Sequence, residues 1–277
     1  MEFTVAGKRV FAATGGRAFE ATGGRAFASG RRALLFVHGA GLDHTVWMLP
    51  ARYFANHGFS VAALDLPGHG RSEGPALATV EAMGAWLLAA MDELGLARAV
   101  LCGHSMGSLT ALAAAGAAPA RVSALALLAT AHPMAVSDDL MNAAAANDRR
   151  AYDMIVGWGH SRHAHLGRST APGMWMAGGS LRLLERSRPG LLHTDLAAVN
   201  AYAGAPAAAA KVACPTLVLL GDSDRMTPSA RGRAVADAIA GATTVVLKDC
   251  GHMMVAEQPD QVTAVLARHF IGALGDK

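Results

Sequence analysis

The sequence AVLCGHSMGSLTALAAA, at residues 99–115, contains the pattern that decides the fold. It begins with a short apolar run that is typical of a buried strand, and it ends with an Ala- and Leu-rich run that favours a helix. Between them, Gly103-His-Ser-Met-Gly107 is a G-x-S-x-G pattern in the strand–turn–helix setting that a nucleophile elbow requires. Because the chain holds 31 glycines, five residues could match by chance, and the setting is what makes the pattern specific.

The chemistry of such a turn explains its residue types. A sharp turn strains the backbone of Ser105, and side chains in place of Gly103 and Gly107 would collide with neighbouring chain. The strain holds the Ser105 hydroxyl toward a substrate, while the amide of Met106 points into the site at a helix N-terminus. We therefore predict that Ser105 is a nucleophile and that the Met106 N–H is one donor of an oxyanion hole.

The alternation of strand and helix continues on both sides of this elbow. The expected strands are short, apolar and followed by polar residues or glycine: 33–38, 60–65, 99–103, 124–129, 216–221 and 243–248. Thr79–Leu94 has apolar residues at helical spacing, and Pro259 begins a final helical pattern. Thr227 followed by Pro228 predicts a helix N-cap with proline in the first turn. The pattern predicts an α/β fold with a mostly parallel, doubly wound sheet and helices on both faces.

The alternation breaks between about residues 132 and 210, where Met, Trp, Gly and His are scattered among helical pieces. We interpret this stretch as a helical cap that roofs the site and supplies substrate contacts. The expected organisation is a core in two parts, 1–131 and 211–277, with the cap at 132–210. Within the first part, ATGGRAF at 13–19 recurs at 21–27, and its Gly-Gly pairs predict turns in an N-terminal hairpin region.

Composition narrows the class of protein. A chain of 277 residues, 52% of them hydrophobic, can bury one large core. A net charge of +3 without a Lys/Arg block disfavours nucleic-acid and acidic-membrane partners. Three separated cysteines beside apolar runs predict buried, reduced thiols. Residues 1–30 lack an apolar signal-peptide core, and no uninterrupted apolar stretch is long enough to span a membrane, so we expect a cytoplasmic protein.

Four further segments carry a family resemblance: HGAG at 38–41, DLPGHGRS at 65–72, GDSD at 221–224, and Gly251-His252 followed by Glu257. Together with the elbow, and in this order, they make the chain resemble the α/β-hydrolase family over nearly its whole length. The resemblance implies an oxyanion loop at the first segment, a catalytic acid at the third and a catalytic histidine at the fourth. It also implies that the backbone N–H of Ala40 is the second oxyanion donor.

A serine hydroxyl needs a general base, and histidine suits that task near neutral pH. Of the twelve histidines, His252 follows the last strand through a glycine and completes the Ser…Asp…His order of this fold. His104 is close in sequence, but its place on the elbow should point its ring away from the serine. His38 and His69 are interpreted as residues that order loops by hydrogen bonding.

The acid that orients the histidine comes from the resemblance, which favours Asp224. Asp222 stays an alternative, with a hydrogen-bonded turn as its other role. Some relatives carry the acid after the sixth strand, and there Asp138 and Asp139 would be distant substitutes for Asp224.

In the cap, Trp158, Met174, Trp175 and Met176 could line an apolar substrate pocket or could form the cap's own core. We expect Trp158, Trp175 and Met253 to line the substrate pocket. His160, His163 and His165 lie together without a carboxylate or cysteine, so they are interpreted as cap-surface residues. We expect neither a metal nor another cofactor. Trp47 is expected to anchor the core.

A serine at the elbow disfavours epoxide and haloalkane hydrolysis, because those relatives place aspartate there. The resemblance implies a carboxylesterase that forms an acyl-enzyme with a small to medium ester. One alternative is a C–C bond hydrolase of ring-fission products, which Asp224-Arg225 resembles but Met226 and Met253 do not. The other is a non-catalytic small-molecule binding protein on the same fold. The oligomeric state stays open, with a homodimer as one alternative.

Overall fold

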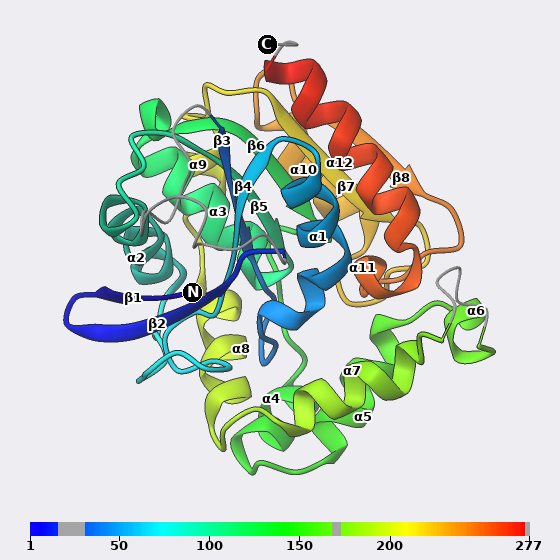
Figure 1. Cartoon of the computed structure of the whole chain (residues 1–277). Helices are drawn as coiled ribbons and strands as arrows, with labels where there is room; N and C mark the ends of the chain where they lie inside the picture. Colours follow the sequence, from blue (N-terminus) through cyan, green and yellow to red (C-terminus); the bar gives the residue numbers. More distant parts are fainter. Residues whose placement is uncertain (16–30, 168–172, 275–277) are drawn as a thin grey trace.

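The computed structural model of the chain describes residues 1–15, 31–167 and 173–274. An eight-stranded sheet with the order β1-β2-β4-β3-β5-β6-β7-β8 forms its centre (Figure 1). The strands are β1 Glu2–Val5, β2 Lys8–Ala13, β3 Arg32–Val37, β4 Phe59–Leu64, β5 Ala99–His104, β6 Val122–Leu128, β7 Thr216–Gly221 and β8 Thr243–Leu247. Strands β3 to β8 pair in parallel, which confirms the predicted doubly wound sheet and all six expected strands.

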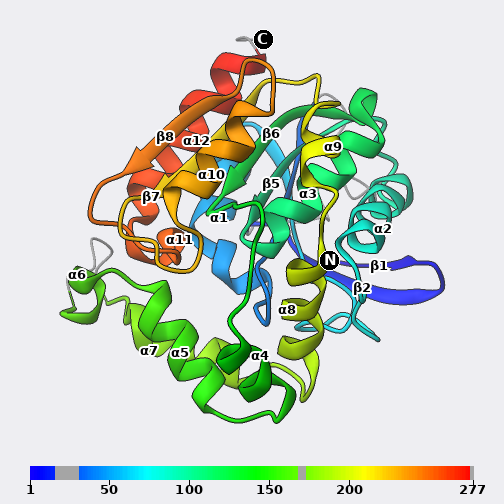
Figure 2. The same ribbon diagram turned by 180° about the vertical axis from the view of Figure 1, so that it is seen from behind.

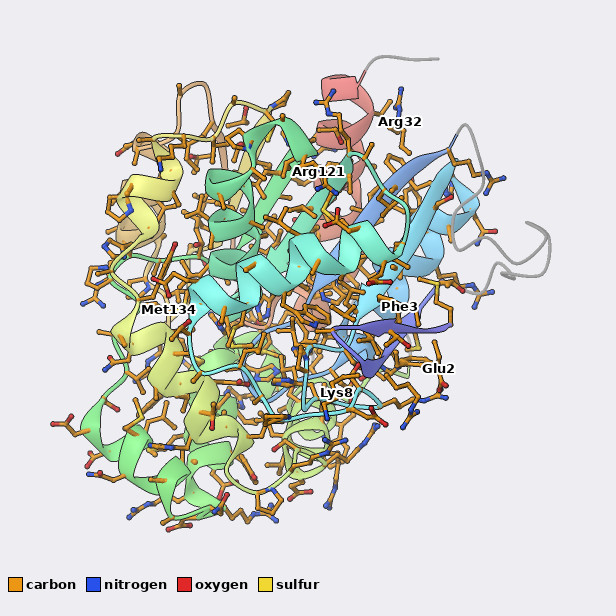
Figure 3. The ribbon with its side chains drawn as sticks, turned by 90° about the vertical axis from the view of Figure 1, so that its left-hand side faces the viewer. Glu2, Phe3, Lys8, Arg32, Arg121 and Met134 are labelled. Atoms are coloured by element: carbon orange, nitrogen blue, oxygen red, sulfur yellow. The ribbon has the colours of Figure 1, made fainter. Side chains whose placement is uncertain are left out.

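Two strands were not predicted. β1 and β2 form an antiparallel hairpin that joins the sheet through β4. The hairpin therefore ends at Ala13, where the ATGGRAF repeat begins, and the predicted turns of the repeat fall almost entirely outside the described residues. Figure 3 looks onto this edge, with Glu2, Phe3 and Lys8 on the hairpin. β1 alternates polar and apolar residues, and β2 begins with Lys8-Arg9, so neither strand shows an apolar run as long as those of the sheet's interior.

Helices cover both faces of the sheet. The core helices are α1 Met48–Asn56, α2 Val80–Glu93, α3 Met106–Ala117, α10 Ser229–Asp237, α11 Met254–Glu257 and α12 Pro259–Leu274, with short 3₁₀ turns at His44–Trp47 and Pro119–Arg121. Helices α1 and α12 share one apolar cluster, and α2, α3 and α10 share the other (Figures 1 and 2). Trp47 is fully buried and stacks on Phe36 with ring centroids 4.7 Å apart, which confirms it as a core anchor.

In the described part of the segment between β6 and β7, the regular elements are helices: α4 Asp138–Ala145, α5 Arg150–Gly159, α6 Arg162–His165, α7 Met176–Glu185, α8 Leu191–Ala201 and α9 Ala205–Ala209. Helices α4 to α8 gather at one end of the molecule (Figure 1). Helices α4, α5, α7 and α8 share a small apolar core that includes Leu140, Leu184 and Leu192 and that also takes in Leu42 and Met253 from loops of the sheet. The insert therefore packs directly on loops that follow the strands.

The insert lies at the carboxyl end of the parallel strands. Arg32 and Arg121, at or just before the amino ends of β3 and β6, lie far from it, whereas Met134 follows β6 and lies toward it (Figure 3). The cysteines Cys102, Cys214 and Cys250 are free and buried, as predicted. Among the helices within the described ranges, none combines the length and apolarity that a membrane crossing requires.

Candidate active site

The elbow places Ser105 between β5 and α3. Ser105 has φ 54° and ψ −120°, a left-handed conformation that costs energy for any residue other than glycine. A Cβ on Gly103 would collide with the carbonyl oxygen of Gly107, and one on Gly107 would collide with that of Val37. The Ser105 N–H donates to the Leu128 carbonyl of the neighbouring strand at 2.9 Å. Both glycines are therefore required by close backbone packing around the serine.

His252 and Asp224 meet at the carboxyl ends of β8 and β7. They are 3% and 6% exposed, and Nδ1 of His252 lies 2.9 Å from Oδ2 of Asp224. His252 and Ser105 line the same cavity. The structure thus brings together the three residues that the sequence assigned to a triad, although they are far apart along the chain.

Asp224 is held as a carboxylate. Its Oδ1 accepts hydrogen bonds from the N–H groups of Met226 and Thr227, both at 2.8 Å. Burial alone would raise the pKa of Asp224, but the positive charge and hydrogen bond of His252, together with the Thr227 hydrogen bonds, lower it below its ordinary value. A buried carboxylate of this kind favours the Nδ1–H tautomer of His252 and stabilises its imidazolium form.

Thr227 has a different role from the predicted one. Helix α10 begins at Ser229, and Pro228 rather than Thr227 occupies its N-cap position without a side-chain capping bond. The Thr227 hydroxyl instead lies 2.6 Å from Oδ2 of Asp224 and 3.0 Å from Nδ1 of His252. The N-cap prediction was wrong because a Thr-Pro pair before a helix carries a strong local signal. The contact of Thr227 with Asp224 and His252, in contrast, forms only in the folded loop.

The alternative acids lie elsewhere. Asp222 is exposed, and its Oδ1 accepts from the Ser223 hydroxyl at 2.8 Å and from the Cys250 N–H at 3.3 Å. These bonds match a turn-holding role. Asp138 and Asp139 are exposed in the first turn of α4.

His104 contacts the loop of His252 rather than the serine. Its Nε2 lies 2.8 Å from the carbonyl oxygen of His252, to which it donates. Burial, reinforced by the nearby charge of His252, lowers the pKa of His104 to about 3, so its ring is neutral. A ring nitrogen that donates to a carbonyl has no free lone pair, so Nε2 of His104 cannot take a proton from Ser105.

The two predicted oxyanion donors border the same cavity. Met106 is the first residue of α3, whose first backbone bonds run from Ser108 and Leu109 to the carbonyl of Ser105. Its amide therefore belongs to the helix N-terminus, where N–H groups have no acceptor within the helix. Ala40 lies in a tight turn that the Leu42 N–H closes by donating to Gly39 at 3.2 Å. Both Ala40 and Met106 line the cavity.

The cavity has a volume of about 280 Å³ and is lined mostly by apolar side chains from the core and from α4, α5, α7 and α8. Trp158 and Met253 line it, as the sequence suggested for a pocket. Trp175, named with them, is 72% exposed and faces a neighbouring hollow together with Met174 and Met176. That hollow and the cavity share Met253 in their walls.

Among the clustered histidines of the insert, His160 and His163 have partners within the protein, and His160 is buried rather than at the surface, which corrects that prediction for this residue. His160 is buried, with Nδ1 3.0 Å from the Val156 carbonyl and Nε2 3.1 Å from the Ser180 hydroxyl. Burial lowers the pKa of His160, and its contacts are those of a neutral ring that donates from Nδ1. His163 lies 3.9 Å from Asp249. These contacts do not require a metal ion.

Within the described residues, Asp43, His44 and Asp65 bring three potential metal-ligating atoms within 4.8 Å of one another. These atoms already serve the fold. Asp65 accepts from the N–H groups of His44 and Arg71, and Asp43 accepts from the Thr45 N–H. The cluster is therefore explained by loop-ordering hydrogen bonds.

Two buried carboxylates at the site had no role assigned from sequence. Glu257 accepts from the Gly251 N–H at 3.1 Å and, across 96 residues, from the Ser161 N–H at 3.0 Å. It thus joins the His252 loop to the insert. Asp195 of α8 accepts from the Gly41 N–H at 2.8 Å. Only the spacing of Glu257 after Gly251-His252 was visible in the sequence; nothing local marks Asp195.

Comparison with known proteins agrees with this architecture. The family model described as alpha/beta hydrolase fold matches residues 32–259. The dihydrolipoyllysine-residue acetyltransferase component of the acetoin cleaving system from Cupriavidus necator is 30% identical over 268 residues, covering 88% of this chain. The chain spans 64% of that relative's length.

Two solved structures are similar over almost the whole chain. The enol-lactonase from Burkholderia xenovorans LB400 has a TM-score of 0.83 and 24% identity, covering 98% of this chain and 99% of its own. A thermophilic esterase from Thermogutta terrifontis has a TM-score of 0.82 and 24% identity, covering 99% of both chains. At this identity the likeness shows a shared fold.

Proposed function

The chain belongs to the α/β-hydrolase family, and from this premise we propose that it is a serine hydrolase of small to medium carboxylic esters. The observation that carries the proposal is one cavity that joins a strained Ser105 to a buried, hydrogen-bonded His252–Asp224 pair. This is the combination that activates a serine hydroxyl for acyl transfer. The similarity in fold to an esterase and to an enol-lactonase supports the same class of reaction.

In the proposed reaction, the Ser105 hydroxyl oxygen attacks the ester carbonyl while His252 takes its proton. The amides of Ala40 and Met106 stabilise the negative charge that develops on the carbonyl oxygen. His252 then protonates the leaving alcohol as the acyl-enzyme forms. Water, deprotonated by His252, attacks this ester, and the acid leaves as Ser105 regains its proton.

Asp224 and Thr227 orient the base in this scheme. The carboxylate accepts from Nδ1–H of His252, which leaves the other ring nitrogen, Nε2, as the proton acceptor. The Thr227 hydroxyl hydrogen-bonds to the same Asp224 oxygen, so the carboxylate is restrained from two sides. We propose Thr227 as a positioning residue, because it acts on the histidine through Asp224.

The insert serves as the cap in this proposal, with core parts 1–131 and 211–277 and the cap at 132–210. Support comes from the cavity, whose walls combine residues of the insert with those of the sheet loops. A volume of about 280 Å³ suits a short or medium acyl group rather than a long chain. We propose that Trp158 and Met253 contact the acyl group. The three free, buried cysteines support a reducing, cytoplasmic location.

The test is turnover of p-nitrophenyl esters of increasing acyl length, together with a lactone and a dienoate ring-fission product. We expect ester turnover that is lost in Ser105→Ala and kept in Ser223→Ala, a serine beside the site whose hydroxyl bonds only to Asp222 among the described contacts. Faster turnover of the ring-fission product would favour C–C hydrolysis. Tight ligand binding without Ser105-dependent turnover of any substrate would contradict an enzymatic role.

A further inference from the structure

A buried ion pair lies beneath the oxyanion loop, outside the proposed triad. Asp195, on the cap helix α8, is fully buried. Its Oδ2 lies 2.8 Å from the Gly41 N–H nitrogen and 2.8 Å from Nε2 of His69. Within the described part of the chain, its Oδ1 is buried without a hydrogen-bond partner. A carboxylate in this setting is costly to bury unless a cation balances it.

The Gly41 amide belongs to the turn that presents Ala40. The Leu42 N–H donates to Gly39, and Gly41 has φ +67° at the third position, which is the pattern of a type II turn. A Cβ on Gly41 would lie 3.1 Å from Leu192 of α8 and 3.2 Å from Leu184 of α7. Helices α7 and α8 therefore lie close to Gly41, the same residue whose amide donates to Asp195.

Among the described residues, both polar partners of the His69 ring are hydrogen-bond acceptors. Its Nδ1 lies 3.0 Å from the Pro67 carbonyl oxygen, and its Nε2 faces the Asp195 carboxylate. Both nitrogens must therefore carry a proton to satisfy these contacts, which makes the ring an imidazolium. Burial alone would lower the pKa of His69, but the charge and hydrogen bond of Asp195 raise it above the ordinary value of 6.5.

The other charged or titratable groups around His69 leave this assignment intact. The ring of His38 lies 4.7 Å from that of His69, and burial lowers its pKa to about 4, so it is neutral. Asp65 accepts from both the backbone and the ring of His44. The Arg188 guanidinium donates to the Ser72 carbonyl, in the loop that carries His69. Asp195 is the carboxylate that contacts the His69 ring directly.

We propose that the Asp195–His69 ion pair positions the oxyanion hole. The ion pair fixes the Gly41 amide, so that Ala40 keeps its place opposite Ser105 only when α8 packs against this turn. The inference rests on the proposed function, because an oxyanion hole has meaning only for acyl transfer. Asp195 and His69 are positioning residues, since neither is among the residues that line the cavity.

The ion pair gives a pH dependence with a definite sign. The imidazolium form of His69 is complete below its raised pKa and is lost as pH rises through that value. Turnover should therefore fall at alkaline pH as the hold on Gly41 weakens. Replacing the carboxylate by an amide removes the charge that raises the pKa, so the decline should begin at lower pH. The acidic side of the pH profile should stay where it is.

The kinetic test compares Asp195→Asn and His69→Gln with Glu185→Gln, which removes another cap carboxylate that pairs with Arg149 at 2.8 Å. For Asp195→Asn we expect kcat to fall by about tenfold to a hundredfold, with KM changed less than about threefold, and an alkaline limb at lower pH. For His69→Gln we expect a similar fall in kcat and no alkaline limb in the pH profile. Glu185→Gln should leave the profile unchanged. An Asp195→Asn enzyme with normal kcat and an unmoved alkaline limb would overturn the proposal.

A second measurement needs neither turnover nor a folded Asp195 variant. Long-range ¹H–¹⁵N spectra of histidine-labelled protein should show one ring with both nitrogens still protonated above pH 6.5, and His69→Gln should remove that signal. Absence of a persistent imidazolium would refute the ion pair even if the enzyme is a serine hydrolase. Turnover that survives in Ser105→Ala would instead refute the proposed function and leave this signal unaffected.

Discussion

The elbow around Ser105 and the cap helix α8 both contribute to one site, but different contacts hold them. The elbow is fixed by backbone packing: Gly103 and Gly107 have no room for a side chain, and Ser105 bonds to a neighbouring strand. Helix α8 is fixed by side chains, through Asp195 and an apolar contact on Gly41. On the proposed function, the reacting groups are thus built into the core, whereas their alignment depends on the packing of α8. Substitutions can therefore test the elbow around Ser105 and helix α8 separately.

The largest effect is expected on the core side. Asp224→Asn keeps the shape of the triad but removes the charge that fixes the His252 tautomer, so kcat should fall by about 10⁴-fold with little change in KM. Steady-state kinetics on a p-nitrophenyl ester measure this directly. Asp222→Asn is the matched control and should stay within about twofold. Normal turnover in Asp224→Asn together with a loss in Asp222→Asn would reverse the assignment of the acid.

Glu257→Gln tests the carboxylate that joins the two regions. It weakens charge-assisted bonds to the Gly251 and Ser161 amides, so the free energy of unfolding should fall by about 2 to 3 kcal/mol. Because the His252 loop loses one of its restraints, we also expect a moderate fall in kcat. Denaturant unfolding gives the first quantity and kinetics the second. Unchanged stability would show that neither loop depends on this carboxylate.

Thr227→Val should have a smaller effect. It removes the hydroxyl beside Asp224 but keeps the shape of the side chain, so kcat should fall by about tenfold while Thr227→Ser retains most activity. The pH dependence of kcat provides the discriminating readout, because weaker restraint of Asp224 should shift the acidic limb. A Thr227→Val enzyme with an unchanged rate and an unmoved limb would leave the hydroxyl without a positioning role.

The smallest effect concerns the cap wall. Trp158→Ala enlarges the cavity beside Ser105, so kcat/KM for the best acyl length should change by about 3- to 30-fold, while shorter esters change less. Trp175→Ala is the control, because this residue is 72% exposed and faces the neighbouring hollow. An acyl-length profile that shifts only in Trp175→Ala would move the substrate pocket to that hollow.

The same division explains what could be predicted from the sequence. The buried strands and the elbow follow local rules, so apolar runs and the glycines around Ser105 were sufficient to predict them. Thr227 was misassigned because its local cap signal competes with a contact formed only in the folded loop. Asp195 lies 154 residues from the Gly41 amide that it holds, and a charged residue on a helix looks like any solvated one until the fold buries it.

The central claim is that Ser105 is the nucleophile of an acyl-transfer reaction, and covalent trapping tests it most directly. The protein would be treated with a p-nitrophenyl alkylphosphonate, and its intact mass and peptide masses measured. We predict a single phosphonyl adduct on the peptide that contains Ser105, loss of activity in proportion to labelling, and no adduct in Ser105→Ala. An adduct on another residue would contradict this assignment. Full turnover by the Ser105→Ala variant, which carries no adduct, would contradict it as well.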